Sequence, residues 1–75
     1  MAKRNKSKES VYKVVEVIGT STKSWAEAGR NAVETAAATL RDLRVAEVVK
    51  LDMTVAKGKV VTYRARVALS FKYGS

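Results

Sequence analysis

Apolar and polar residues alternate with the period of a strand near the start of this chain. Residues 11–18, VYKVVEVI, are rich in β-branched side chains, which favour an extended backbone. Each face of the predicted strand carries one charged residue among apolar ones, Lys13 on one face and Glu16 on the other. We therefore expect both faces of this strand to contact protein.

A helical period follows Gly19, which we expect to end the first strand. Apolar residues recur at intervals of three and four over residues 25–42, which predicts one amphipathic helix. Ser24 and Glu27 have the spacing of a capping box, in which Ser24 accepts from the Glu27 N–H and Glu27 reaches back to Ser24. The apolar stripe is mainly alanine: Ala28, Ala32, Ala36 and Leu40, with Gly29, Val33 and Ala37 beside them. Such small side chains permit close packing on a sheet but bury little area each.

The strand period returns in residues 44–55 and 60–73, and the residues between them, AKGK, predict a hairpin turn. Strict alternation places on one face of the first strand Val45, Glu47, Val49, Leu51, Met53 and Val55, with Asp52 on the opposite face. One face of the second strand holds Val61, Tyr63, Ala65, Val67, Leu69, Phe71 and Tyr73. The pattern predicts an α+β fold of order β-α-β-β, with a three-stranded antiparallel sheet curled around one helix.

The last two predicted strands are longer than the helix that must cover them. Residues 60–73 span roughly 46 Å as a strand, whereas residues 25–42 span about 27 Å as a helix. Long apolar strands without cover would aggregate. We therefore expect the sheet to curl and the chain to associate with copies of itself.

The composition excludes several classes of function. The chain has 75 residues, with neither Cys nor His, which excludes disulfides, thiolate or imidazole zinc sites, and a nucleophile with a His base. No apolar run approaches the ~20 residues of a membrane span, and residues 1–10 lack the apolar centre of a signal peptide. These absences favour a non-catalytic cytoplasmic protein.

Basic residues outnumber acidic ones, and the formal net charge is +8. Residues 1–10, MAKRNKSKES, contain four basic residues and one acidic residue, and we expect them to form a disordered arm before a single domain of residues 11–75. Such an arm can bind nucleic acid by counterion release. It has no aromatic residues for stacking, so we expect a solvated arm rather than a nucleic-acid partner.

Three segments together, VYKVVEVIGTSTKSW, TLRDLRVAEVV and YRARVALSFKY, resemble the dodecin family over residues 11–73. The resemblance implies a β-α-β-β subunit whose sheet wraps around its helix, and twelve copies that form a hollow shell. It also implies a storage or sequestering protein, not an enzyme, that binds flavins such as riboflavin or FMN between subunits.

Two positions that recognise the flavin in members of this family are changed here. A tryptophan before the Glu-Val of the second strand stacks on the flavin ring, and a glutamine on the third strand bonds to its edge; the resemblance places these positions at Val45 and Arg64. Valine has no aromatic face, and an arginine cannot accept a hydrogen bond. We therefore expect weak or absent flavin binding.

Acidic residues supply an alternative ligand class, a calcium or magnesium ion. Glu16, Glu47 and Asp52 are the candidate ligands, since carboxylates that symmetry brings together can hold a hard cation. The alternative is that each carboxylate pairs with Arg or Lys of a neighbouring subunit. Metal ions are also a ligand class that the resemblance suggests.

Trp25 and three basic residues remain as candidates. Trp25 is either a relocated stacking platform or a packing or subunit-contact residue, a role in which aromatic residues are enriched. Arg64 and Arg66 share a face of the last strand with Lys72, where they can bind a phosphate group or form salt bridges.

Overall fold

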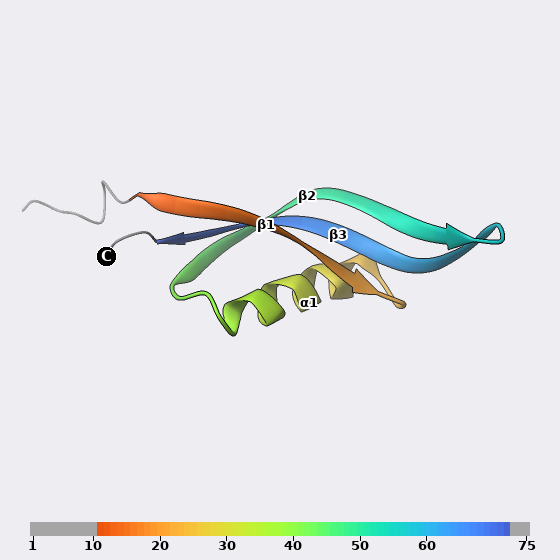
Figure 1. Cartoon of the computed structure of the whole chain (residues 1–75), viewed down its shortest axis with the longest axis horizontal. Coiled ribbons are helices and arrows are strands. Elements are labelled where there is room, and N and C mark those ends of the chain that lie inside the picture. Colours follow the sequence, from red (N-terminus) through yellow and green to blue (C-terminus); the bar gives the residue numbers. More distant parts are fainter. Residues whose placement is uncertain (1–10, 73–75) are drawn as a thin grey trace, which may run out of the picture.

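The order of elements confirms the β-α-β-β prediction. A computed structural model describes residues 11–72, so the predicted arm at residues 1–10 and the strand end at Tyr73 lie outside the described residues. The elements are β1 (Tyr12–Ser21), α1 (Trp25–Ala37), β2 (Leu43–Ala56) and β3 (Lys59–Lys72). Figure 1 shows α1 against one face of the sheet and the β2–β3 hairpin extending beyond it.

The three strands form one antiparallel sheet in the order β1-β3-β2, so β3 lies at the centre. β1 pairs with β3 from Tyr12, opposite Lys72, to Ser21, opposite Tyr63. Beyond Tyr63, β3 pairs only with β2, and this two-stranded part ends at Lys57 and Gly58. Both turn residues have positive φ, 54° and 74°, which is typical of the two-residue type I′ hairpin turn.

The core lies between α1 and the inward-facing side chains of the sheet. It consists of Ala28, Ala32, Ala65, Val67 and Leu69. Gly19 of β1 lies directly under the helix, because a Cβ there would be 2.8 Å from Ala32 Cβ and closer still to the Ala28 carbonyl oxygen. The small residues of the stripe therefore let the helix backbone pack directly on the strand backbone.

The predicted end of the helix at residue 42 is wrong, because α1 ends at Ala37. The turn after it tightens: the N–H groups of Thr39 and Leu40 both donate to the Ala36 carbonyl, at 3.0 and 2.9 Å, and the Thr39 hydroxyl donates to the same oxygen at 3.2 Å. A side chain that bonds locally to the backbone competes with helix continuation. Leu40 still packs against the core, but from the turn.

The predicted faces of β2 are also wrong, because the strand contains a β-bulge. Val48 lies opposite Val67 and Lys50 lies opposite Arg66, so Val49 is an extra residue. A bulge shifts the alternation by one residue. As a result Glu47 and Asp52, predicted on opposite faces, lie on the same face of the sheet.

Candidate functional site

All five candidate ligand positions lie on the face of the sheet away from α1, called here the outer face. Each row across this face has one residue from β1, one from β3 and one from β2. The rows are Val14–Ser70–Val45, Glu16–Ala68–Glu47, Ile18–Arg66–Lys50 and Thr20–Arg64–Asp52. The antiparallel register thus brings together residues from the three strands that no local sequence motif connects.

Arg64 and Asp52 form the best-defined polar contact of the outer face. Arg64 Nε donates to Asp52 Oδ1 at 2.7 Å and Nη2 donates to Oδ2 at 2.9 Å. This two-point geometry is typical of a guanidinium group paired with a carboxylate. The hydrogen bond from Arg64 lowers the pKa of Asp52 against a smaller opposing effect of desolvation, and it raises the pKa of Arg64.

A second ion pair joins Arg66 to Glu16, with 3.5 Å between Nη1 and Oε1. Both side chains are about half exposed, so water screens this pair. Arg64 and Arg66 therefore both bind carboxylates of their own subunit, whereas the sequence left open a phosphate group or a neighbouring subunit as their partner.

Glu16 and Glu47 flank the same residue, the small and largely buried Ala68. Glu47 forms no hydrogen bond or ion pair within residues 11–72. The part of the subunit that the structure describes contains no group of three His, Cys, Asp or Glu side chains able to hold a metal ion. Carboxylate oxygens suit calcium, which takes six to eight oxygen ligands, so such a site would need ligands from more than one subunit.

The two positions that the resemblance predicts to be altered flavin contacts lie in different rows. Val45 lies opposite Ser70 and is 53% exposed, so it offers a small aliphatic surface without a ring. Arg64 directs two of its donor nitrogens to Asp52. The local geometry thus provides neither an aromatic platform at Val45 nor a hydrogen-bond acceptor at Arg64.

Trp25 lies on the other side of the sheet, at the first turn of α1. Its ring meets Tyr63 edge to face, with 5.2 Å between centroids and an interplanar angle of 70°. Its indole N–H donates to the backbone oxygen of Asp52 at 2.9 Å. Trp25 is therefore a packing residue that attaches the helix to the hairpin. Sequence reasoning missed the link to Asp52, which is 27 residues away.

The start of α1 confirms half of the predicted capping box. Ser24 Oγ accepts from the Glu27 N–H at 3.0 Å, but the Glu27 carboxylate accepts from the Ser21 hydroxyl at 3.1 Å instead of reaching back to the Ser24 N–H. The hydroxyl oxygen of Ser21 itself accepts from the Lys23 and Ser24 N–H groups. Ser21 thus joins the end of β1 to the start of the helix.

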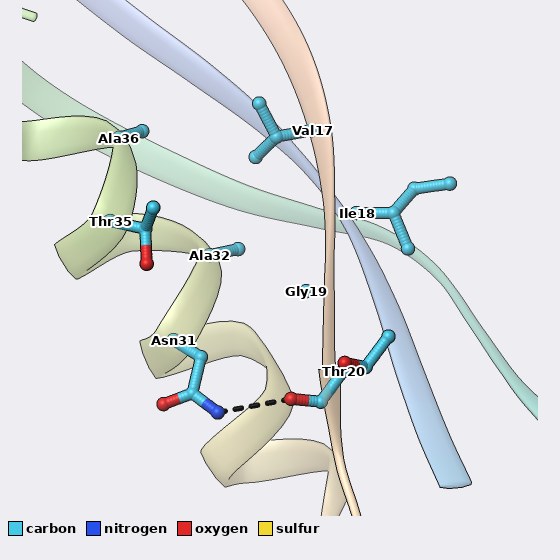
Figure 2. A pocket seen from close by; sticks show the side chains of 8 residues that line it. All are labelled: Val17, Ile18, Gly19, Thr20, Asn31, Ala32, Thr35 and Ala36. Carbon is cyan, nitrogen blue, oxygen red and sulfur yellow. Dashed lines mark hydrogen bonds between the residues drawn. The ribbon is translucent and has the colours of Figure 1, made fainter. Parts of the chain in front are cut away.

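Two grooves lie beside the helix. The first, about 300 Å³ between β1 and α1, is lined by Val17, Ile18, Gly19, Thr20, Asn31, Ala32, Thr35 and Ala36, and in Figure 2 the Asn31 amide reaches across it to the Thr20 carbonyl, at 3.0 Å. The second, about 350 Å³ between α1 and β2, is lined by Trp25, Ala26, Gly29, Arg30, Val33, Glu34, Ala46, Val48 and Val67. Neither groove contains a candidate carboxylate of the outer face.

Large apolar side chains are exposed on both faces of the sheet, before β1 and at the start of α1. Within residues 11–72 they are Val11, Tyr12, Val14, Ile18, Trp25, Val45, Val48, Val49, Leu51, Met53, Val55, Val60 and Val61. They far outnumber the side chains of the core, and exposed apolar surface on this scale marks interaction sites. The described part of the chain has no helix with the length and apolar character needed to cross a membrane.

Comparison with known proteins agrees with this geometry. A family model named Dodecin matches residues 11–74. A protein named calcium dodecin, from Mycobacterium tuberculosis (strain ATCC 25618 / H37Rv), is 46% identical over 63 residues, which cover 84% of this chain and 89% of that protein.

Two solved structures are similar in fold. The dodecin from Streptomyces coelicolor has a TM-score of 0.81 at 35% identity, and the match covers 88% of this chain and 94% of that one. The calcium dodecin of Mycobacterium tuberculosis, described as a calcium-chelating antigen with a novel calcium-binding site, has a TM-score of 0.75 at 48% identity, over 84% and 90% of the two chains.

Proposed function

This chain belongs to the dodecin family, and on that premise we propose that it is a non-catalytic, cytoplasmic homo-dodecamer that binds or sequesters a small ligand at its subunit interfaces. The exposed apolar side chains on both faces of the sheet carry the proposal. A core of five mostly small residues is thin for a lone subunit, and oligomerisation is a common way to stabilise such small folds.

Among the ligand classes, a hard divalent cation such as calcium fits the outer face best. Glu16, Glu47 and Asp52 share this face, and the calcium dodecin of Mycobacterium tuberculosis, which is 46% to 48% identical to this chain, is named for calcium. When bound, the cation would supply charge neutralisation between carboxylates. Glu47 is the first residue that we assign to it, because its carboxylate forms no ion pair within the described subunit.

Tight flavin binding is not part of the proposal. Val45 supplies no ring for stacking, a contact that contributes about 0.5 to 1.5 kcal/mol beyond area burial. Arg64 cannot accept a hydrogen bond, and its fork is already engaged with Asp52. A riboflavin titration followed by fluorescence should give weak or no quenching, and submicromolar affinity would contradict this reasoning.

Native mass spectrometry of the purified protein tests the shell. Twelve copies of the 8.2 kDa chain give about 98 kDa, and excess mass identifies any ligand that purifies with it. A monomer or dimer would refute the dodecamer and leave the apolar strands to another partner.

Calorimetric titration of chelator-treated protein with CaCl2 tests the ligand. We expect saturable binding that Glu47→Gln weakens. Glu34→Gln is the matched control, since it removes the same charge from α1, on the other side of the sheet. Equal loss in both variants would assign the effect to net charge rather than to Glu47, and absence of binding in the unmodified protein would refute the cation function.

A further inference from the structure

The groove between α1 and β2 is a part of the sheet that the helix leaves open. It measures about 350 Å³. Val15 and Val17 of β1 pack against the core, whereas β2 contributes only Leu43, its first residue, within the described part of the chain. Val48 and Trp25, which line the groove, are 56% and 36% exposed. The groove is therefore apolar surface that the described subunit does not cover.

Two opposite charges line this groove without a partner in the described subunit. Arg30 and Glu34 lie one turn apart on α1. Within residues 11–72, neither side chain forms a hydrogen bond or an ion pair. Their order, a basic residue four positions before an acidic one, is the less favourable one for a pair on the same helix. An occupant that matches the groove should therefore present a carboxylate to Arg30 and a cation to Glu34.

We propose that this occupant is a second copy of the chain, whose α1 lies antiparallel to α1 of the first copy across a twofold axis. The inference rests on the self-assembly proposed above and names one of its interfaces. A twofold axis that brings one residue of a copy to a second residue of its partner also makes the reciprocal contact. A crossing centred between Arg30 and Glu34 thus places Arg30 of each copy beside Glu34 of the other.

The residues around the charged pair suit such a contact. Ala26, Gly29 and Val33 line the same groove, and side chains this small let two helices approach closely. A helix of 13 residues is only about 20 Å long, so its face provides less than the roughly 800 Å² per partner of a standard interface. The exposed Leu51 and Met53 continue the helix side of β2 beyond the groove and can supply further area.

The self-complementary spacing of the two charges favours a second copy over a small apolar ligand. A small apolar ligand would fill the groove but would leave Arg30 and Glu34 unpaired. The contact also uses the helix side of the sheet, so it leaves the carboxylates of the outer face to other subunits. It can therefore be tested separately from the cation function.

The experiment is a dilution series of the full-length protein at low salt, followed by sedimentation velocity. Arg30→Glu sets two carboxylates against each other in both contacts of the interface, and like charges across an interface are costly. We expect this variant to dissociate at a subunit concentration at least about tenfold higher than the unmodified protein does. Glu34→Arg should have the same effect. The double variant, Arg30→Glu with Glu34→Arg, restores opposite charges and should assemble to within about threefold of the unmodified protein.

The double variant is also the control for fold damage and for net charge. Its net charge equals that of the unmodified protein, and its recovery excludes misfolding as the cause of the loss in the single variants. Glu34→Gln removes the ion pairs without creating repulsion, so it should weaken assembly by no more than about fivefold per pair. It should therefore stay assembled at the higher concentrations of a calorimetric titration.

Trp25 gives a second readout, because it is the only tryptophan of the chain and lines the groove. Its emission should move to longer wavelength when dilution separates the subunits and exposes the groove to water. Emission that stays unchanged through dissociation would assign the groove to another occupant, such as a small apolar ligand, and refute the proposed contact.

Three outcomes of the dilution series would overturn the inference. Single variants that assemble at the same concentration as the unmodified protein refute this interface but leave self-assembly standing. Loss in the single variants without recovery in the double variant shows that Arg30 and Glu34 do not meet across subunits. An unmodified protein that is a monomer at every concentration refutes the interface and the proposed shell together.

Discussion

The contact between α1 and β1 predicts that Gly19→Ala is strongly destabilising. The added Cβ would lie 2.8 Å from Ala32 Cβ and 2.9 Å from its backbone nitrogen, with the Ala28 carbonyl oxygen closer than either. Two of these three obstacles are backbone atoms of the helix, which no side-chain rotation can move. The helix must therefore shift as a body.

The size of that shift sets the expected loss. Ordinary contact begins near 3.4 Å, so relief at Ala32 Cβ alone requires a movement of about 0.6 Å. A gap of that order removes a quarter or more of the dispersion energy of each contact across the interface. The core consists of only five residues between the helix and the sheet. We therefore expect the free energy of unfolding to fall by about 3 kcal/mol, which is at the upper end for overpacking.

Gly29→Ala is the matched control, because it makes the same chemical change on the same interface. A Cβ at Gly29 would meet Ala65 Cβ at 4.0 Å, an ordinary contact, and alanine favours the helix over glycine by roughly 0.5 to 1 kcal/mol. We would measure urea unfolding by circular dichroism at one fixed subunit concentration, because the proposed assembly would add to stability. The two substitutions should move the midpoint in opposite directions. A Gly19→Ala midpoint equal to that of the unmodified protein would refute the close packing.

Three further predictions follow from single contacts. Ser24→Ala removes the acceptor of the Glu27 N–H and should lower the free energy of unfolding by about 1 kcal/mol. An unchanged midpoint of thermal unfolding would contradict the cap. Lys57→Gly removes a Cβ at φ 54° and should raise the free energy of unfolding by roughly 0.5 to 1 kcal/mol, whereas a lower unfolding midpoint would argue against the turn geometry. Because Arg64 lowers the pKa of Asp52 below its ordinary 3.8, the pair stabilises the fold above that value and stops doing so as the pH falls through the lowered pKa. The difference in urea midpoint between the unmodified protein and Asp52→Asn should therefore shrink from about pH 7 to about pH 3, and a constant difference would show that the ion pair is not its source.

Periodicity predicted the type and order of the elements but not two backbone details. Leu40 has the correct helical phase, yet it enters the core from a turn, so its apolar character alone could not show where the helix ends. The bulge at Val49 leaves no mark in a run of β-branched residues, because each of them suits either face of a strand. Both failures are local backbone events that hydrophobic pattern does not encode.

For the candidate site as well, the sequence predicted which residues matter but not which partners they have. The sequence singled out Arg64 and Asp52, and the structure joins them, but the predicted partners of Asp52 were a cation or a basic residue of a neighbouring subunit. Strand register decides this pairing, and one bulge residue in β2 moved Asp52 onto the face of Arg64. The bond from Trp25 to the Asp52 carbonyl could not be predicted, since it joins a helix start to a strand backbone.

The central position of β3 has a consequence for the order in which the fold can form. β1 and β2 never pair with each other, and both need β3, which leaves the ribosome after them. Until then the apolar residues Val15 and Val17 have only α1 to cover them. Completion of the sheet joins segments as distant as Tyr12 and Lys72, and such nonlocal pairing is slow. The nascent chain is therefore most open to aggregation just before its last strand emerges, and synthesis at low temperature or with a holding chaperone should improve the yield of soluble protein.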